Sequence, residues 1–267
     1  KQLQEAQAEG DKIKKEGLPE QVTPLVFGIT GYGHVSTGAQ EILDILPFKQ
    51  INPKELISLT KQSNFSRNLV FKVVFKEEHL VKPRAGQNRF DLQDYYDNPD
   101  KYRSQFEDYI PHLAVLVNCI YWDERYPRLV TRKFLKKLFD EEENPRLRVI
   151  GDISCDIEGS IEATVKTTEP DNPVYLYNPL EEQAIDGYEG KGVVILAVDN
   201  LPCEISREAS LDFSQVLKSF VPQIAKTDFS VNFEACALPA YIKNAVIAVS
   251  YTHLRAHETS LHLVCRL

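Results

Sequence analysis

The sequence lacks several features that would point to particular classes of protein. Its longest uninterrupted apolar run, residues 193–198, is far shorter than the roughly 20 residues that a membrane helix needs. Acidic residues outnumber basic ones by 39 to 31, so the formal net charge of −8 leaves no basic excess to attract a nucleic-acid backbone. We therefore expect neither a membrane-spanning chain nor a nucleic-acid partner.

Cysteine is scarce and follows no pairing pattern. The chain has five cysteines, an odd number without a C-x-x-C pair, at positions Cys119, Cys155, Cys203, Cys236 and Cys265. This pattern predicts reduced thiols, and neither a disulfide framework nor a zinc site. With 43% hydrophobic and 26% charged residues, the chain is otherwise typical of a globular protein of one large or two modest domains.

The two ends of the chain differ from its middle. Methionine is absent and the polar opening has no signal-peptide core, so we expect the chain to begin inside a longer protein. Residues 1–20 predict a connector helix from a missing N-terminal domain, ended by Gly17 and Pro19. Residues 249–267 have no core periodicity, and we expect a non-native tail. Its His257 and His262 miss the two-histidine spacing of a zinc helix by one residue, so no metal site is predicted.

Residues 21–248 are predicted to form one dinucleotide-binding domain, because short apolar runs alternate there with helical patterns. Strands are predicted at residues 24–30, 113–121, 147–154 and 193–198. Helices are predicted at residues 35–46, 131–139 (with Thr131 as a possible N-cap), 206–226 and 91–109, whereas residues 68–76 are a strand or a hairpin arm. Apolar strands separated by helices indicate an α/β fold, a doubly wound parallel sheet of Rossmann-like type with irregular insertions.

A glycine-rich turn lies between the first predicted strand and the first helix. Its residues, Gly31-Tyr-Gly33-His-Val-Ser-Thr-Gly38, occupy the place of the dinucleotide-binding glycines, with the spacing stretched by two residues. Gly31 would allow the tight turn, Gly33 would let the backbone approach a pyrophosphate, and Gly38 would permit close packing of helix on strand. The hydroxyls of Ser36 and Thr37 fit a phosphate cradle or helix caps equally well.

The segment of residues 48–56, where the second strand of a dinucleotide-binding unit would end, bears on the choice of dinucleotide. Asn52 stands near the position where an acid would bind the ribose 2′-hydroxyl of NAD, with Lys49 and Lys54 beside it. Glu55 is the nearest acid, so no carboxylate is expected at the position itself to repel a 2′-phosphate. This favours NADP over NAD, although the residues could equally be solvated polar groups at a strand end.

Two further strand ends carry polar residues where ligands of parallel sheets bind. Residues 152–156 and 198–202 would present free Asp, Ser or Asn side chains to the crevice at the sheet's edge. The alternative is that these residues only cap turns. Cys155 has no base adjacent in sequence and is expected to be an inert small residue rather than a nucleophile.

Together these segments resemble a known family. Residues 25–226 look like the cofactor-binding half of lysine-ketoglutarate reductase, as found in α-aminoadipic semialdehyde synthase, and of lysine-forming saccharopine dehydrogenases, within the wider alanine dehydrogenase and transhydrogenase family. The resemblance is carried by the glycine turn, Val117-Asn-Cys-Ile-Tyr-Trp, Arg128-Leu-Val-Thr, Asp152-Ile-Ser-Cys-Asp, Gly159-Ser-Ile-Glu and Val198-Asp-Asn-Leu-Pro.

The resemblance implies a role for individual residues. For the cofactor it implies His34 and Val35 over the pyrophosphate, with Ser36 in the same cradle, Asn52 facing the adenosine ribose, and Ile153, Val198, Asp199, Asn200 and Leu201 lining the nicotinamide side. For the substrate it implies Ser154, Cys155 and Asp156. NAD-dependent members carry Asp at the second strand end, so Asn52 is a departure that fits NADP. The family's acid/base Lys and His lie in the missing N-terminal domain, so no catalytic residue is predicted here.

The implied chemistry is reductive condensation of lysine with 2-oxoglutarate to saccharopine, with hydride from NADP or NAD. The whole protein would be an oxidoreductase, and these 267 residues alone would bind cofactor without turnover. The expected location is cytoplasmic, or mitochondrial for a eukaryotic semialdehyde synthase. The alternatives are an alanine dehydrogenase-like enzyme and a non-catalytic regulatory module that binds a dinucleotide.

Overall fold

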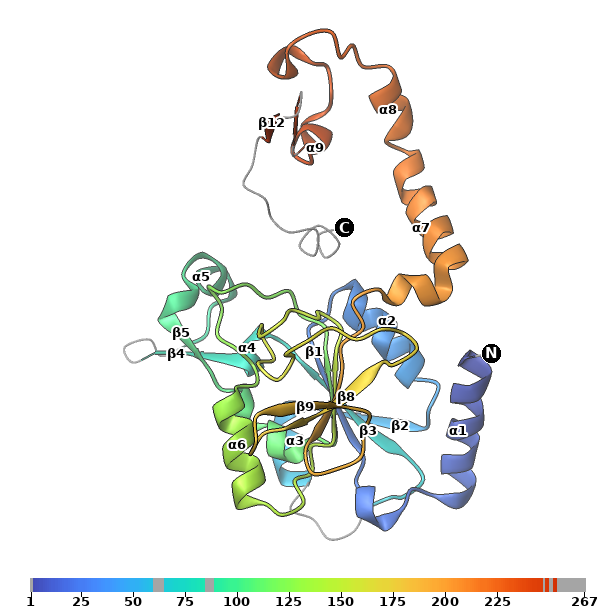
Figure 1. The fold of residues 1–267 in the computed structure, drawn as a ribbon, viewed down its shortest axis with the longest axis vertical. Helices are drawn as coiled ribbons and strands as arrows, with labels where there is room; N and C mark the ends of the chain where they lie inside the picture. The colour runs from blue at the N-terminus through green and yellow to red at the C-terminus, as the bar shows by residue number, and fades with distance from the viewer. Residues whose placement is uncertain (1, 60–64, 85–88, 247, 250–251, 254–267) are drawn as a thin grey trace. The chain divides into compact units, whose positions relative to one another are not determined.

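A computed structural model describes residues 2–59, 65–84, 89–246, 248–249 and 252–253. Within them, eight strands form one sheet (Figure 1). In spatial order these strands are β2 (Phe48–Ile51), β3 (Val70–Phe75), β1 (Val26–Thr30), β6 (Val115–Asn118), β7 (Val149–Asp152), β10 (Val193–Leu196), β8 (Val174–Asn178) and β9 (Gln183–Asp186). The first six pair in parallel, which confirms the doubly wound α/β prediction.

Helices cover both faces of the sheet. On one face, α1 (Gln2–Glu16) and α2 (His34–Leu43) enclose a small core that includes Ile13, Ile29 and Leu43. On the other, α3 (Pro53–Leu59) and α6 (Arg132–Glu141) cover a larger core around Leu56 and Leu135. In Figure 1 the two pairs of helices lie on opposite sides of the strands. A helix, α1, thus lies within the predicted residues 1–20 and packs on this sheet; its role as a connector stays a prediction.

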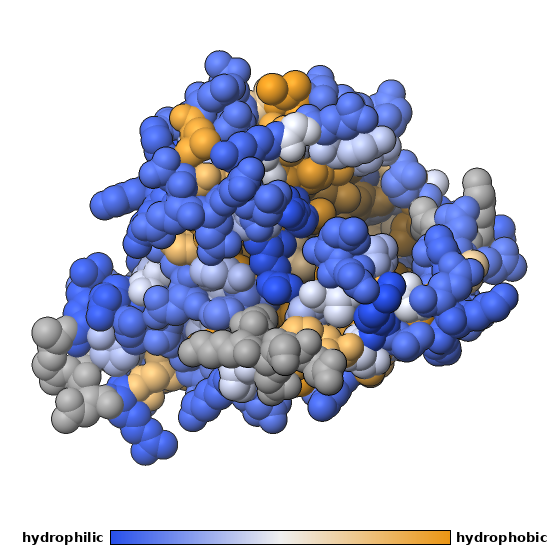
Figure 2. Space-filling model, turned by 90° about the horizontal axis from the view of Figure 1, so that it is seen from below, coloured by the Kyte–Doolittle hydropathy of each residue, from blue (hydrophilic) through white to orange (hydrophobic). Residues whose placement is uncertain are grey.

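The exterior seen in Figure 2 is mostly hydrophilic, with hydrophobic side chains gathered in limited patches and a hollow. None of the described helices is long and apolar enough to cross a bilayer.

The order of the first three strands departs from the usual dinucleotide-binding sheet, in which the second strand along the chain lies beside the first. Here β3 lies between β1 and β2, with Thr30 opposite Phe75 and Ile51 opposite Val73. The ambiguous segment at residues 68–76 is therefore a central strand. Its Lys72 is buried and pairs with Asp44 at the end of α2.

Other differences from the sequence predictions have local causes. The helix predicted over residues 91–109 is shorter than expected: it is α5 (Leu92–Asp97), which ends at Asn98 and Pro99. The chain then continues through the 3₁₀ turn η2 (Pro99–Lys101), strand β5 (Tyr102–Ser104) and the 3₁₀ turns η3 (Phe106–Asp108) and η4 (Ile110–His112). Strand β5 pairs with β4 (Val81–Pro83), which follows the short helix α4 (Glu77–Leu80). The antiparallel pair β8 and β9 was not predicted. Thr131 does cap α6, because its Oγ1 accepts the amide of Phe134 at 3.1 Å.

The chain divides into two compact units, residues 1–199 and residues 200–267. The second unit contains η5 (Leu201–Ile205), α7 (Ser206–Lys218), α8 (Val221–Ala225), η6 (Phe233–Ala235), α9 (Ala240–Lys243) and the short pair β11 (Ala248–Val249) and β12 (Thr252–His253). The helix predicted over residues 206–226 is interrupted before Pro222, which lies in the first turn of α8. The predicted single domain over residues 21–248 stays a prediction, and most of the predicted tail lies outside the described residues.

Gly28 in β1 offers a test of how tightly side chains pack against the strand that precedes the glycine turn. A Cβ there would meet Leu113 Cδ1 at 2.6 Å and Phe75 Cε2 at 3.1 Å, whereas a Cβ on Gly151 of β7 would meet nothing nearer than 3.9 Å. We expect Gly28→Ala to lower the free energy of unfolding by about 1–3 kcal/mol through overpacking. Gly151→Ala should leave it unchanged or raise it slightly, because alanine has the lower unfolded-state entropy. Urea unfolding of both variants would measure this; equal stabilities would contradict the packing.

Candidate functional site

The glycine turn that joins β1 to α2 needs its first glycine. Gly31 has φ +84°, and a Cβ there would lie 3.2 Å from the carbonyl oxygen of Cys119. Its amide donates to the carbonyl of Phe75 at the end of β3, at 2.9 Å. Only glycine combines this left-handed conformation with such close backbone neighbours, so the predicted role of Gly31 as the tight-turn residue agrees with the geometry.

The N-terminus of α2 faces open space. Gly33 is the N-cap residue, no side chain caps the helix, and a Cβ on Gly33 would meet nothing within 4 Å. His34 and Val35 in the first turn are exposed. The first amides of a helix have no partner within the helix, and here they remain available to an anion. A pyrophosphate requires free amides of this kind at a helix N-terminus, and the residues present at the start of α2 would fit a pyrophosphate.

Three predicted roles in α2 change. The Ser36 hydroxyl is fully buried; it donates to the Gly31 carbonyl at 2.8 Å and accepts from Gln40, so it secures the turn and does not form a phosphate cradle. Thr37 Oγ1 likewise donates to the Gly33 carbonyl, at 3.0 Å. Gly38 does not serve close packing of helix on strand, because it is exposed and a Cβ there would meet nothing within 4 Å.

Asn52 is the N-cap of α3. Its Oδ1 accepts the amide of Glu55, and the Glu55 carboxylate accepts the amide of Asn52, both at 2.9 Å, which is a capping box. The expectation that no carboxylate stands at this strand end is therefore wrong, since Glu55 reaches back to it. Asn52 is exposed, but β3 separates its strand from β1. That it faces a ribose stays a prediction.

A buried polar network joins the ends of the central strands β1, β6 and β7. Thr30 Oγ1 donates to Asn118 Oδ1 at 2.8 Å, and Asn118 Nδ2 donates to Asp152 Oδ1 at 2.8 Å and to Ser160 Oγ at 2.9 Å. Thr164 Oγ1 donates to Asp152 Oδ2 at 2.6 Å. All five side chains are at most 1% exposed. The prediction of a free Asp152 side chain in a ligand crevice is thus wrong, because its carboxylate is consumed inside the protein.

Burial has chemical consequences at this strand end. Desolvation raises the pKa of Asp152 to about 6, although the hydrogen bonds from Thr164 and Asn118 lower it. Desolvation, with a contribution from the Asp152 charge, also raises the pKa of the Cys155 thiol to about 12. A thiol with such a pKa is a poor nucleophile, in agreement with the inert role predicted for Cys155.

The segment that follows β7 turns most of its side chains inward. Cys155 Sγ donates to the carbonyl of Ala197 at 2.9 Å, and Ser154 Oγ donates to the carbonyl of Ile120. Cys155 adopts φ +55°, which helps the chain to reverse here. Neither side chain is therefore arranged to contact a ligand in this structure, whereas Ile153 and Asp156 are half-buried.

The residues predicted for the nicotinamide side fall in both units. Val198 is 4% exposed and lies beside Thr168, and Asp199 is exposed at the end of the first unit. Asn200 and Leu201 begin the second unit, where the Asn200 carbonyl accepts the amide of Cys203. Their roles toward a cofactor stay predictions.

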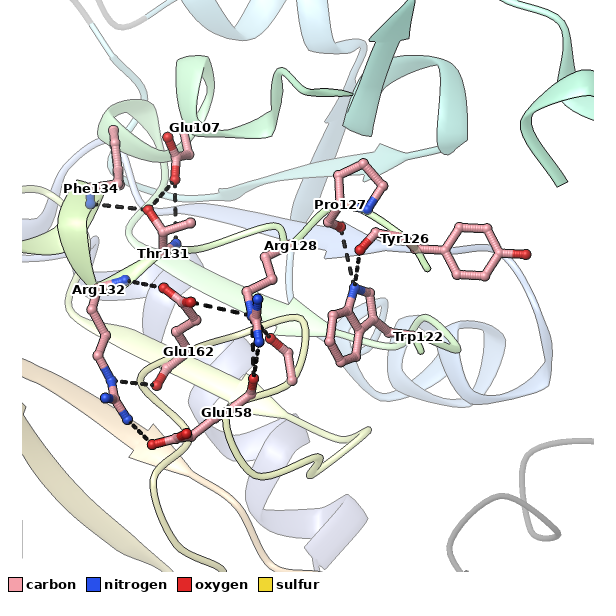
Figure 3. A network of polar contacts seen from close by, with 11 residues as sticks. Glu107, Trp122, Tyr126, Pro127, Arg128, Thr131, Arg132, Phe134, Glu158 and Glu162 are labelled. Carbon is pink, nitrogen blue, oxygen red and sulfur yellow. Dashed lines mark hydrogen bonds and ion pairs between the residues drawn. The ribbon is translucent and has the colours of Figure 1, made fainter. Parts of the chain in front are cut away.

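Three of the segments that carry the family resemblance meet in space through Arg128 and Arg132, for which no individual role was predicted (Figure 3). Arg128 stacks over the Trp122 ring, 5.3 Å from its centroid, and donates to the Gly159 carbonyl at 3.2 Å. Arg132 pairs with Glu158, and its amide donates to Glu162 at 2.8 Å. These contacts fix the loops after β6 and β7 against each other.

Among the residues whose side chains the structure describes, no group of three or more His, Cys, Asp or Glu side chains could hold a metal ion. The described cysteines, Cys119, Cys155, Cys203 and Cys236, are free. Cys265 and the C-terminal His257 and His262 lie outside the described part of the chain.

The pKa of Asp152 predicts a pH dependence of stability. Because the folded-state pKa is raised above the unfolded value, protonation favours the folded state, and stability falls as pH rises from about 4 to about 6.5. The loss amounts to as much as about 3 kcal/mol at neutral pH. Asp152→Asn keeps an acceptor oxygen for Asn118, and its amide nitrogen would donate to Thr164 Oγ1, which reverses the present hydrogen bond. Because the variant cannot ionise, it should flatten this part of the profile. Urea unfolding at pH 5 and pH 7.5 measures it; parallel profiles for variant and wild type would refute a raised pKa.

Comparisons with known proteins agree with this geometry. The family profile described as alanine dehydrogenase/PNT, C-terminal domain, matches residues 65–249. The α-aminoadipic semialdehyde synthase of Arabidopsis thaliana is 38% identical over 263 residues, which cover 95% of this chain and 24% of that protein. The mitochondrial α-aminoadipic semialdehyde synthase of Bos taurus is 31% identical over 252 residues, covering 90% and 27%.

A saccharopine dehydrogenase [NAD(+), L-lysine-forming] of Schizosaccharomyces pombe is 33% identical over 109 residues, 39% of this chain and 26% of that protein. The chain spans about a quarter of the length of these relatives. Family and relatives together indicate a nicotinamide dinucleotide as cofactor. With its mostly parallel sheet and with its glycine turn at the helix N-terminus, the chain belongs to the alanine dehydrogenase/PNT C-terminal domain family.

Proposed function

We propose that this chain is the nicotinamide-dinucleotide-binding part of an oxidoreductase that reduces the imine of lysine and 2-oxoglutarate to saccharopine. The observation that carries the cofactor half of the proposal is the uncapped N-terminus of α2 at Gly33, with open space in front of it. The semialdehyde synthase and saccharopine dehydrogenase relatives support the substrate half.

In the proposed reaction, the ε-amine of lysine attacks the ketone of 2-oxoglutarate and water leaves. When bound, the cofactor supplies the hydride that reduces the resulting carbon–nitrogen double bond. The chain's own contribution is to bind and orient the cofactor. The amides of His34 and Val35 would hold the pyrophosphate, and the half-buried Ile153, with Val198, would border the nicotinamide side. Asp199, Asn200 and Leu201 complete that side in the proposal.

For the substrate, we extend the proposal to the segment that follows β7. Ser154 and Cys155 donate their side-chain hydrogen bonds to protein carbonyls, so contacts from them would come from the backbone, whereas Asp156 would contribute its side chain. Proton transfer and recognition of the substrate carboxylates would belong to another domain of the whole protein, as the family resemblance implies. The substrates lysine, 2-oxoglutarate and saccharopine are thus small molecules held between that domain and this one.

NADP is the dinucleotide that we propose over NAD. Asn52 stands where NAD-dependent members of the family carry an acid, and the carboxylate of Glu55 is engaged in the capping box of α3. The compartment that we propose is the one expected for the whole protein: cytoplasmic, or mitochondrial if the whole protein is a eukaryotic semialdehyde synthase. The name of the bovine relative supports the second location.

Two glycines of the same turn and helix test the proposed pyrophosphate site. A methyl group at Gly33 would occupy the space over the helix N-terminus, whereas a methyl group at Gly38 would point into solvent. Titration with NADPH and NADH, followed by nicotinamide fluorescence, should give about tenfold weaker binding of NADPH for Gly33→Ala, the equivalent of one lost close contact. Gly38→Ala should bind as the wild type does and be slightly more stable.

The wild-type chain should bind NADPH more tightly than NADH. Failure of a folded wild-type chain, verified by circular dichroism, to bind either nucleotide would refute the cofactor proposal. Product analysis of the whole protein with lysine and 2-oxoglutarate, against pyruvate and ammonia, tests the substrate proposal separately.

A further inference from the structure

The strand that ends beside the glycine turn is β3. Thr30 at the end of β1 lies opposite Phe75 at the end of β3, and the amide of Gly31 donates to the Phe75 carbonyl. Lys76 is therefore the first residue beyond the sheet next to the turn. Asn52 follows Ile51, which lies opposite Val73, so Asn52 is level with Val74. It is about two strand spacings, or roughly 10 Å, to the side of β1.

A cavity lies on this side of the turn. Its volume is about 560 Å³, within the range of small-molecule sites. It lies among Tyr32 of the glycine turn, residues 76–78 at the end of β3, and residues 89–92. A dinucleotide whose pyrophosphate lies over the N-terminus of α2 places its adenosine ribose over the strand adjacent to β1. In this sheet the strand adjacent to β1 on the side of the cavity is β3, so the adenosine ribose would lie in the cavity.

The charged groups of the cavity differ in how they are engaged. Glu77 Oε1 accepts the hydroxyl of Tyr96 at 2.8 Å, Glu78 Oε1 lies 3.8 Å from His79 Nε2, and Asp91 Oδ1 accepts the amide of Asp94 at 2.8 Å. Glu77 and Asp91 are thus hydrogen-bonded, whereas Glu78 only lies near His79, whose pKa is lowered by burial, so that this contact is not an ion pair at neutral pH.

The two cations of the cavity are engaged differently. The Lys76 ammonium lies over the Tyr32 ring, 5.6 Å from its centroid, and Lys76 is exposed. Neither Lys76 nor Arg89 forms an ion pair with any residue that the structure describes. Three acids and two bases line the cavity, and the two bases, which form no ion pair with a described residue, are the groups that can bind an anionic ligand.

We propose that this cavity binds the adenosine ribose of the dinucleotide, and that Lys76 contacts the phosphate on its 2′ position. The inference rests on the proposed function, and it moves the specificity-determining residue from Asn52, at the end of β2, to Lys76, at the end of β3. A lysine at this position recognises a 2′-phosphate as a point charge, while Tyr32 holds the lysine side chain over the turn.

Half-cofactors test the assignment without any catalytic step. Binding of 2′,5′-ADP, which carries the 2′-phosphate, and of 5′-AMP, which lacks it, is measured by calorimetry on the 267-residue chain. Lys76→Gln should weaken 2′,5′-ADP about tenfold, the effect of one lost charge-assisted hydrogen bond, and leave 5′-AMP unchanged. Lys76→Arg should keep most of the affinity, because it keeps the charge. Lys54→Gln, just beyond the end of β2, should leave both half-cofactors unchanged.

Each other outcome overturns the inference. Weaker 2′,5′-ADP binding in Lys54→Gln, with Lys76→Gln unaffected, would put the ribose at the end of β2 and leave the proposed function standing. Equal affinity of the wild type for 2′,5′-ADP and 5′-AMP would exclude a 2′-phosphate contact. Loss of 5′-AMP binding in Lys76→Gln, with an unchanged circular dichroism spectrum, would assign Lys76 to another part of the nucleotide. If the folded wild type binds neither half-cofactor nor NADPH, the proposed function fails as well.

Discussion

Asn118 links three neighbouring strands through a single buried amide. Its oxygen accepts from Thr30 of β1, and its nitrogen donates to Asp152 of β7, so the ends of β1, β6 and β7 are tied at one level. An unpaired buried amide or carboxylate would be costly, so the network is stable only when every partner is in place. It fixes the edge of the sheet from which the glycine turn and the loop after β7 both emerge. The geometry of the candidate cofactor site depends on this fixed edge.

The glycine turn uses the same edge in a second way. Gly31 approaches the backbone of the chain beyond β6, and its amide bonds to the end of β3, so three chain segments converge at one residue. The buried hydroxyl of Ser36 then secures the start of α2. The amides at the helix N-terminus are thereby held in place before any ligand arrives. Such preorganisation reduces the entropy that binding must overcome.

Local sequence patterns were sufficient to predict much of the fold around the glycine turn. The apolar run of β1, the glycines after it and the periodicity of α2 predicted a strand, a turn and a helix that the structure confirms. The resemblance to a family was also confirmed, because the alanine dehydrogenase/PNT C-terminal domain profile matches residues 65–249.

What local patterns could not provide was the partner of each group. Nothing in the sequence of β3 indicates that it lies between β1 and β2, since strand order is set by pairings between distant residues. In the same way, an aspartate after a strand reads as a turn cap or as a ligand, and only the surrounding Asn118 and Thr164 show that Asp152 is internal. The signal that was available was three polar residues, Thr30, Asn118 and Asp152, each at the end of an apolar strand.

The placement of β3 also constrains the order in which the sheet assembles. During synthesis, β1 and the glycine turn appear first, but β2 cannot pair with β1 because its parallel partner is β3. The first parallel pairs of the sheet therefore form only once the chain has been made to about Phe75, and the second neighbour of β1 comes at Val115. Pairings of such sequence separation form slowly, and β1 keeps one open, apolar edge until residues 115–118 have been made. An unpaired apolar edge favours aggregation, and here it belongs to the same strand that carries the glycine turn.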